Sequence, residues 1–106
     1  MSELNMARKP RAPNATEKKH IMNVLDIGCI VCRSIGYGNR PAEIHHPYSR
    51  TYPDTHLNVI PLCFEHHRAG GDTSPFISRH PYKKRFIAAY GDEESLLAKV
   101  NDLLIN

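Results

Sequence analysis

Two short stretches decide how this chain is expected to fold: Cys29-Ile-Val-Cys32 and Cys63-Phe-Glu-His66. Each has the two-residue gap that lets a turn direct two donors at one ion, and thiolate and imidazole together are typical zinc ligands. The alternative, that Cys29 and Cys63 are small buried hydrophobic residues, leaves the matched spacing unexplained. The pattern therefore predicts one closed structural zinc site made by Cys29, Cys32, Cys63 and His66.

The length and cysteine content agree with a small metal-stabilised domain. A chain of 106 residues suits one domain, and a core of that size gains from a metal cross-link. Three cysteines do not make a disulfide framework, and the first residues lack the apolar run of a signal peptide or membrane anchor. We therefore expect reduced thiols, a cytoplasmic location and no association with a membrane.

The spacing of apolar residues before and between the zinc pairs predicts three elements. A helix is expected over residues 17–27, with Thr16 as its N-cap and Gly28 at its end. Short strands are expected over residues 42–46 and 57–62, joined by a polar, proline-bearing loop.

Helices are expected in the second half. A short one begins at Phe64 and ends at two glycines, and a second runs over about 81–90. Asp92 caps the last helix, whose apolar face is formed by Leu96, Leu97, Val100, Leu103 and Leu104. Together with the two strands, these elements predict the α+β class.

The N-terminal segment differs from the rest in composition. Residues 1–15 contain two prolines, few apolar side chains and no periodicity, which predicts a flexible basic arm before a zinc-containing domain over 16–106. The first 20 residues hold five basic and two acidic side chains, which accounts for the whole net charge of +3. Such an arm suits either phosphate binding or solubility, and we expect it to take no part in shaping an active site.

Three further histidines lie beside the zinc ligands. Neighbouring residues on a strand point to opposite faces, so His45 and His46 are expected to have different roles. His66 and His67 diverge in the same way on a helix, so one can face zinc while the other faces elsewhere. A closed zinc site leaves no position for a reacting water. The extra histidines therefore indicate a second, catalytic site, with ordinary surface histidines as the alternative.

Two segments, Glu43-Ile-His45-His46 and Asn58-Val-Ile-Pro-Leu-Cys63-Phe-Glu-His66-His67, carry a family resemblance. They resemble the ββα-metal motif of the His-Asn-His (HNH) endonucleases, with a histidine in place of the last zinc cysteine. The two-glycine loop and the Phe86-x-x-x-Tyr90-Gly91 tail are similar to the phage-encoded, Ref-like branch of recombination-enhancing, RecA-dependent nucleases. The resemblance covers residues 16–104. It implies a zinc-stabilised, treble-clef-like HNH core with flanking helices, acting in a bacterial host cell.

The resemblance also implies an activity, the hydrolysis of DNA phosphodiester bonds with Mg²⁺ or Mn²⁺. His46 would be the general base, His45 and His67 would hold the divalent ion, and Asn58 would orient the loop or the base by hydrogen bonding.

One departure from the family pattern leaves the ion's third ligand open. Many members carry another histidine one helical turn after His67, where this chain has Gly71. The candidates are His80, if the loop over residues 70–78 folds back, and Asp54 from the interstrand loop.

Basic side chains surround the expected cut site, and no helix or strand is typical of base reading, so we expect contacts mainly with phosphates. The candidates are Arg8, Lys9, Arg11, Arg40, Arg50, Arg68, Lys83, Lys84 and Arg85. The expected partners are DNA and, from the resemblance, a RecA-type recombinase filament. The alternative function is a non-catalytic zinc-binding, DNA-binding module. A zinc deaminase is excluded because its His-x-Glu and Pro-Cys-x-x-Cys signatures are missing.

Overall fold

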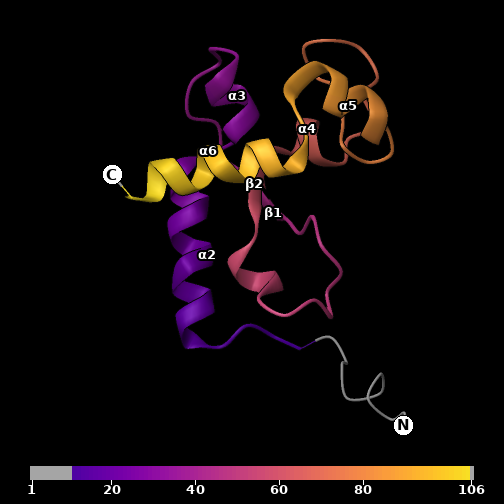
Figure 1. Ribbon diagram of the computed structural model, residues 1–106. Helices are drawn as coiled ribbons and strands as arrows, with labels where there is room; N and C mark the ends of the chain where they lie inside the picture. The colour runs from indigo at the N-terminus through magenta and orange to yellow at the C-terminus, as the bar shows by residue number, and fades with distance from the viewer. Residues whose placement is uncertain (1–10, 106) are drawn as a thin grey trace, which may run out of the picture.

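A two-stranded sheet lies among helices in the computed structural model, which describes residues 11–105 (Figure 1). The α+β class is therefore confirmed. In chain order the elements are α2 (Ala15–Ile27), α3 (Ile30–Ser34), β1 (Glu43–His45), the 3-10 helix η1 (Thr55–Leu57), β2 (Ile60–Leu62), α4 (Phe64–His67), α5 (Lys83–Tyr90) and α6 (Glu93–Ile105). No helix within residues 11–105 is long and apolar enough to cross a membrane.

Helix α2 starts earlier than the sequence suggested. Its N-cap is Asn14, whose side chain accepts a hydrogen bond from the Glu17 N–H at 2.8 Å, while the Glu17 carboxylate accepts from the Asn14 N–H at 2.9 Å. The prediction of Thr16 as the cap was wrong, because this reciprocal capping box satisfies two backbone donors at once. The end at Gly28 was predicted correctly: Gly28 has a φ of 78°, and a Cβ there would lie 2.9 Å from the Arg40 carbonyl oxygen.

The sheet holds one antiparallel pair, with Glu43 opposite Leu62 and His45 opposite Ile60. Strand β2 is shorter than predicted because the chain forms η1 up to Leu57 and then turns at Asn58, whose side-chain amide donates to the Asp54 carbonyl at 2.9 Å. Helix α4 follows β2 directly, so the central elements come in the order strand, strand, helix.

The core forms where α2, α6 and the sheet meet (Figure 1). Val24 of α2, Ile60 of β2 and Leu96 of α6 are almost completely buried. The apolar face predicted for the last helix is confirmed, since Leu96, Leu97 and Val100 are buried while Leu103 and Leu104 pack against the same cluster. The first turn of α6 is thereby held close to β1, where Glu93 hydrogen-bonds to His45.

The segment after α4 folds back along the helix. The N–H groups of Ser78 and His80 donate to the carbonyls of Gly71 and His67 at 2.8 and 2.9 Å. The buried Ser78 hydroxyl accepts from the N–H groups of Gly70 and Gly71 and donates to the Glu65 carbonyl. A Cβ at position 71 would lie 2.5 Å from the Phe76 carbonyl oxygen. The glycine therefore permits the close return of the chain that carries His80 towards α4.

Candidate metal centres and active site

Two pairs of residues from distant parts of the sequence form a buried cluster: Cys29 with Cys32, and Cys63 with His66. Cys29 and Cys63 are the N-caps of α3 and α4, so each thiol sits over the open N–H groups of a short helix. The N–H of Cys32 points at the Cys29 sulfur and the N–H of His66 at the Cys63 sulfur, both at 3.4 Å. Two similar local turns thus present two donors each to one point.

The distances in this cluster fit the edges of a zinc tetrahedron. Zinc bonds of about 2.3 Å to sulfur and 2.0–2.1 Å to nitrogen imply edges of roughly 3.8 Å between sulfurs and 3.5 Å from sulfur to nitrogen. The sulfurs of Cys32 and Cys63 are 3.8 Å apart. The His66 Nδ1 lies 3.6, 3.5 and 3.2 Å from the sulfurs of Cys29, Cys32 and Cys63. The His66 Nε2–H donates to the Pro75 carbonyl at 2.8 Å, which leaves Nδ1 available as a ligand.

The electrostatics of the cluster also favour a bound cation. Burial raises the pKa of the Cys32 thiol, and the neighbouring Cys29 raises it further. Burial acts in the same direction on Cys29, but hydrogen bonds from His66 and from backbone N–H groups outweigh it and lower that pKa to about 7. Packing several thiolates together without a positive charge is costly. The buried cluster is therefore compatible with a structural zinc.

A second cluster lies on the other side of α4, where three imidazoles face one another. His45 comes from β1, His67 from α4 and His80 from the returning segment. Their ring centroids form a nearly equal triangle of 5.3, 5.2 and 5.3 Å, and one ligand atom from each lies within 4.8 Å of the others. Asp54, the other candidate for a third ligand, is exposed at the start of η1 and is not part of this cluster.

Two carboxylates orient this triangle, and the sequence interpretation included neither in the site. The Glu93 carboxylate accepts from the His45 Nε2–H at 2.5 Å, and the Glu43 carboxylate accepts from the His67 Nδ1–H at 2.7 Å. A carboxylate fixes which nitrogen of each ring carries the proton, leaving Nδ1 of His45 and Nε2 of His67 unprotonated. Glu93 also binds Arg79 at 2.7 Å. A carboxylate–histidine arrangement of this kind is typical of metal ligands.

One signal for Glu43 was present in the sequence. It lies two residues before His45, so strand alternation puts both side chains on one face. Nothing comparable marked Glu93, which is 48 residues from His45 and looked only like an acidic residue in the first turn of a helix.

His46 is not one of the three clustered rings, but it lies close enough to His67 for the charge of one ring to affect the other. Its Nε2 lies 3.2 Å from Nδ1 of the buried His56, and the two rings meet edge to face. Burial lowers the pKa of His46 to about 4, with Arg50 and His56 adding to the effect. The imidazole is therefore neutral at neutral pH and can accept a proton. The Asn58 side-chain amide donates to the Asp54 carbonyl and so stabilises the turn of η1.

The basic residues predicted to contact DNA fall into two groups. Within the described residues, Arg11, Arg40, Arg68 and Arg85 form ion pairs with Glu17, Glu65, Glu43 and Asp72, respectively. Arg50, Lys83 and Lys84 are exposed, as are Arg11, Arg68 and Arg85 despite their ion pairs. Arg8 and Lys9 lie outside the described residues.

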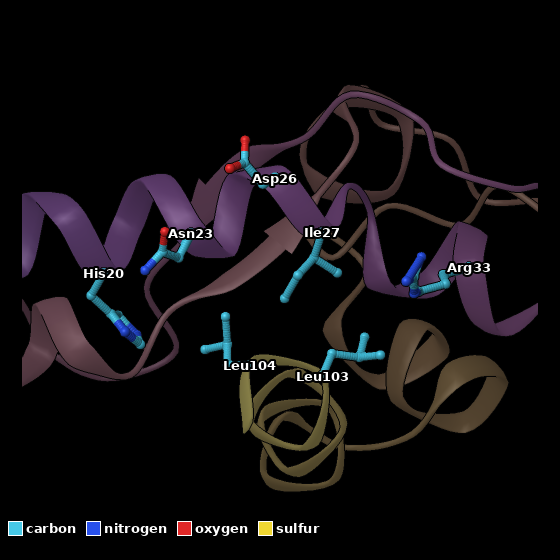
Figure 2. A pocket seen from close by; sticks show the side chains of 7 residues that line it. All are labelled: His20, Asn23, Asp26, Ile27, Arg33, Leu103 and Leu104. Atoms are coloured by element: carbon cyan, nitrogen blue, oxygen red, sulfur yellow. The ribbon is translucent and has the colours of Figure 1, made fainter. Parts of the chain in front are cut away.

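A separate cavity of about 440 Å³ lies between α2, α3 and the end of α6 (Figure 2). It is lined by His20, Asn23, Asp26, Ile27, Arg33, Leu103 and Leu104, none of which belongs to either cluster. The candidate active site is thus the surface around the three histidines, not this cavity.

Comparison with known protein families gives an independent result. Residues 13–105 match the family described as "Recombination enhancement, RecA-dependent nuclease", and this range includes every residue of both clusters. No curated protein sequence matches the chain. The match covers most of the chain and agrees with the resemblance seen in the sequence, so this protein belongs to the recombination enhancement, RecA-dependent nuclease family.

Proposed function

We propose that this protein is a metal-dependent endonuclease of the HNH type that hydrolyses DNA phosphodiester bonds. The observation that carries the proposal is the meeting of His45, His67 and His80 beside His46, at the junction of β1 and α4. The strand, strand, helix order of β1, β2 and α4 supports the same assignment. The family name adds a nuclease function and a dependence on RecA.

The three clustered histidines would hold Mg²⁺ or Mn²⁺. His45 and His67 would present the nitrogens left unprotonated by Glu93 and Glu43, and His80 would supply the third ligand that the sequence left open. When bound, such an ion supplies positive charge opposite the phosphate and the departing oxygen. An exposed His80 leaves one side of the site open to a DNA phosphate.

His46 would act as the general base. Its neutral imidazole accepts a proton from water as the water oxygen attacks phosphorus, and the bond from phosphorus to the departing oxygen breaks. His46 lies next to His45 in sequence but is not one of the three clustered rings, so its lone pair would be available for this proton. Arg50 lies near enough to affect the charge of His46 and would help to attract the phosphate.

The Cys29, Cys32, Cys63 and His66 cluster would hold zinc for a structural purpose. The same short helix α4 carries His66 and His67, so a zinc on one side fixes the orientation of the histidine on the other. We also propose a phage or prophage origin and a RecA-type filament as the partner. The family description supports the partner, and the sequence resemblance supports both the partner and the origin.

Cleavage of supercoiled plasmid DNA by purified protein tests the proposal, with and without Mg²⁺ and with and without a recombinase filament. Nicked or linear product that needs Mg²⁺ and is lost in His46→Ala is the expected result. His20→Ala is a matched control, because His20 lines the cavity of Figure 2. If the zinc-loaded protein binds DNA but cuts under none of these conditions, the alternative of a non-catalytic zinc-binding module is correct.

A further inference from the structure

We propose that His56 is a positioning residue that holds His46 in the tautomer with its proton on Nε2, so that Nδ1 is free to accept a proton from water. The inference deepens the proposed function and rests on His46 being the base. His56 lies in η1, in the loop between the strands, and the sequence interpretation assigned it no role.

The hydrogen bonds around His56 determine the direction of each proton. His56 is 1% exposed, and its Nε2 lies 2.8 Å from the Arg11 carbonyl oxygen. A carbonyl only accepts, so the Nε2 of His56 carries a hydrogen. In a neutral ring its Nδ1 then only accepts, and the His46 Nε2 at 3.2 Å must be the donor. The free lone pair of a neutral His46 is therefore on Nδ1.

The two hydrogen-bond partners of His56 are a backbone carbonyl and another imidazole, and neither carries a negative charge. A charged imidazole is costly to bury without an acidic partner, and both ring nitrogens of His56 already meet neutral groups. The Glu17 carboxylate lies near His56. Both oxygens of that carboxylate accept from the Arg11 guanidinium, at 2.7 and 2.8 Å, so its charge is already balanced.

The same contacts connect the active site with the N-terminal segment. The Arg11 side chain is fixed by Glu17, whose carboxylate also caps α2 through Asn14, so the Arg11 carbonyl has a set position against His56. Figure 1 shows residues 11–14 leading into the start of α2, and the hydrogen bond from His56 to the Arg11 carbonyl ties this segment to the loop between β1 and β2. We expected residues 1–15 to take no part in shaping the active site. For Arg11 we now propose a supporting role, because its carbonyl accepts the hydrogen bond that orients His56.

Two variants of His56 separate positioning from simple stability. In His56→Gln, the amide N–H can donate to the Arg11 carbonyl while the amide oxygen accepts from His46, so the proton directions are kept. In His56→Ala, both bonds are lost. We expect His56→Ala to lower kcat on the order of 10- to 100-fold, the usual effect of losing a residue that orients a functional imidazole. The KM for DNA and the Mg²⁺ dependence should stay unchanged, and His56→Gln should recover most of the rate.

Nitrogen-15 NMR of the histidine rings in the zinc-loaded protein, without DNA or Mg²⁺, gives a readout that needs no activity. His46 should be the Nε2–H tautomer in the parent and in His56→Gln, with Nδ1–H appearing in His56→Ala. His20→Ala should leave the His46 signals unchanged. An Nδ1–H tautomer of His46 in the parent overturns the inference, as does an unchanged tautomer in a folded His56→Ala. If the tautomers behave as expected but the parent does not cut DNA, the positioning stands and the proposed function fails.

Discussion

The two clusters of this molecule share a helix of four residues and yet differ in almost every physical property. The Cys29, Cys32, Cys63 and His66 cluster is buried, and the remaining ring nitrogen of its histidine donates to a neutral backbone carbonyl. The histidine cluster is partly exposed, and two of its rings donate to carboxylates. A closed thiolate set suits an ion that holds the fold, whereas an open imidazole set suits an ion that meets a substrate. The neighbours His66 and His67 thus belong to sites with different chemistry.

The largest expected effect follows from removing one ligand of the Cys29, Cys32, Cys63 and His66 cluster. Cys63→Ala should abolish zinc binding and cooperative folding, because structural zinc contributes about 10–16 kcal/mol in small zinc-dependent folds. Elemental analysis should find one zinc per parent chain, and circular dichroism after chelation should show loss of the helices. A chain that stays folded without zinc contradicts the structural role.

His46→Ala should slow DNA cleavage strongly and leave both clusters intact. We expect cleavage to slow by a factor on the order of 10² to 10⁴, the usual contribution of a positioned general base. Zinc content, Mg²⁺ affinity and DNA affinity should match the parent, since the hydrogen bond of the His46 ring is to His56, which belongs to neither cluster. If His46→Ala cuts at the parental rate while His45→Ala is inactive with its ion still bound, the two roles are reversed.

Substitutions in and around the cluster of His45, His67 and His80 should weaken Mg²⁺ binding to different degrees. His67→Ala removes a proposed ligand, so its activity should fall and partly recover at high Mg²⁺. Glu93→Gln keeps all three histidines and removes only the charge behind His45, so we expect a smaller loss in Mg²⁺ affinity, on the order of 10- to 100-fold. Mg²⁺ titrations of the cleavage rate measure both variants. An unchanged Mg²⁺ dependence in His67→Ala argues against its role as a ligand.

Removing residues 1–10 should have the smallest effect, confined to DNA affinity. The deletion takes away Arg8 and Lys9 but keeps the Arg11 carbonyl, so we expect an unchanged kcat and a flatter salt dependence of DNA binding. Extending the deletion to residue 15 should also lower kcat, because it removes the acceptor of His56. Equal kcat values for the two deletions contradict the link between Arg11 and His46, and an unchanged salt slope shows that residues 1–10 do not bind phosphate.

Local patterns accounted for several features in advance. The end of α2 at Gly28, the Asp92 cap and the apolar face of α6 all follow from residues within a few positions of one another. The N-cap of α2 shows where local interpretation failed. Both Asn14 and Thr16 are good caps, and the choice was decided by Glu17, which returns a hydrogen bond to Asn14 alone.

The sequence by itself determined which metal-ligating side chains are paired within a few residues of one another. Turn and strand geometry repeat over two to four residues, so Cys29 with Cys32, Cys63 with His66, and the divergence of neighbouring histidines could be inferred without a fold. Only the tertiary structure decided which distant groups meet these donors. His80 reaches His67 through a loop whose return depends on Gly71, and Glu93 and Arg11 reach His45 and His56 from opposite ends of the chain. Such contacts depend on how helices pack across the sheet, and packing of this kind leaves no periodic trace in the sequence.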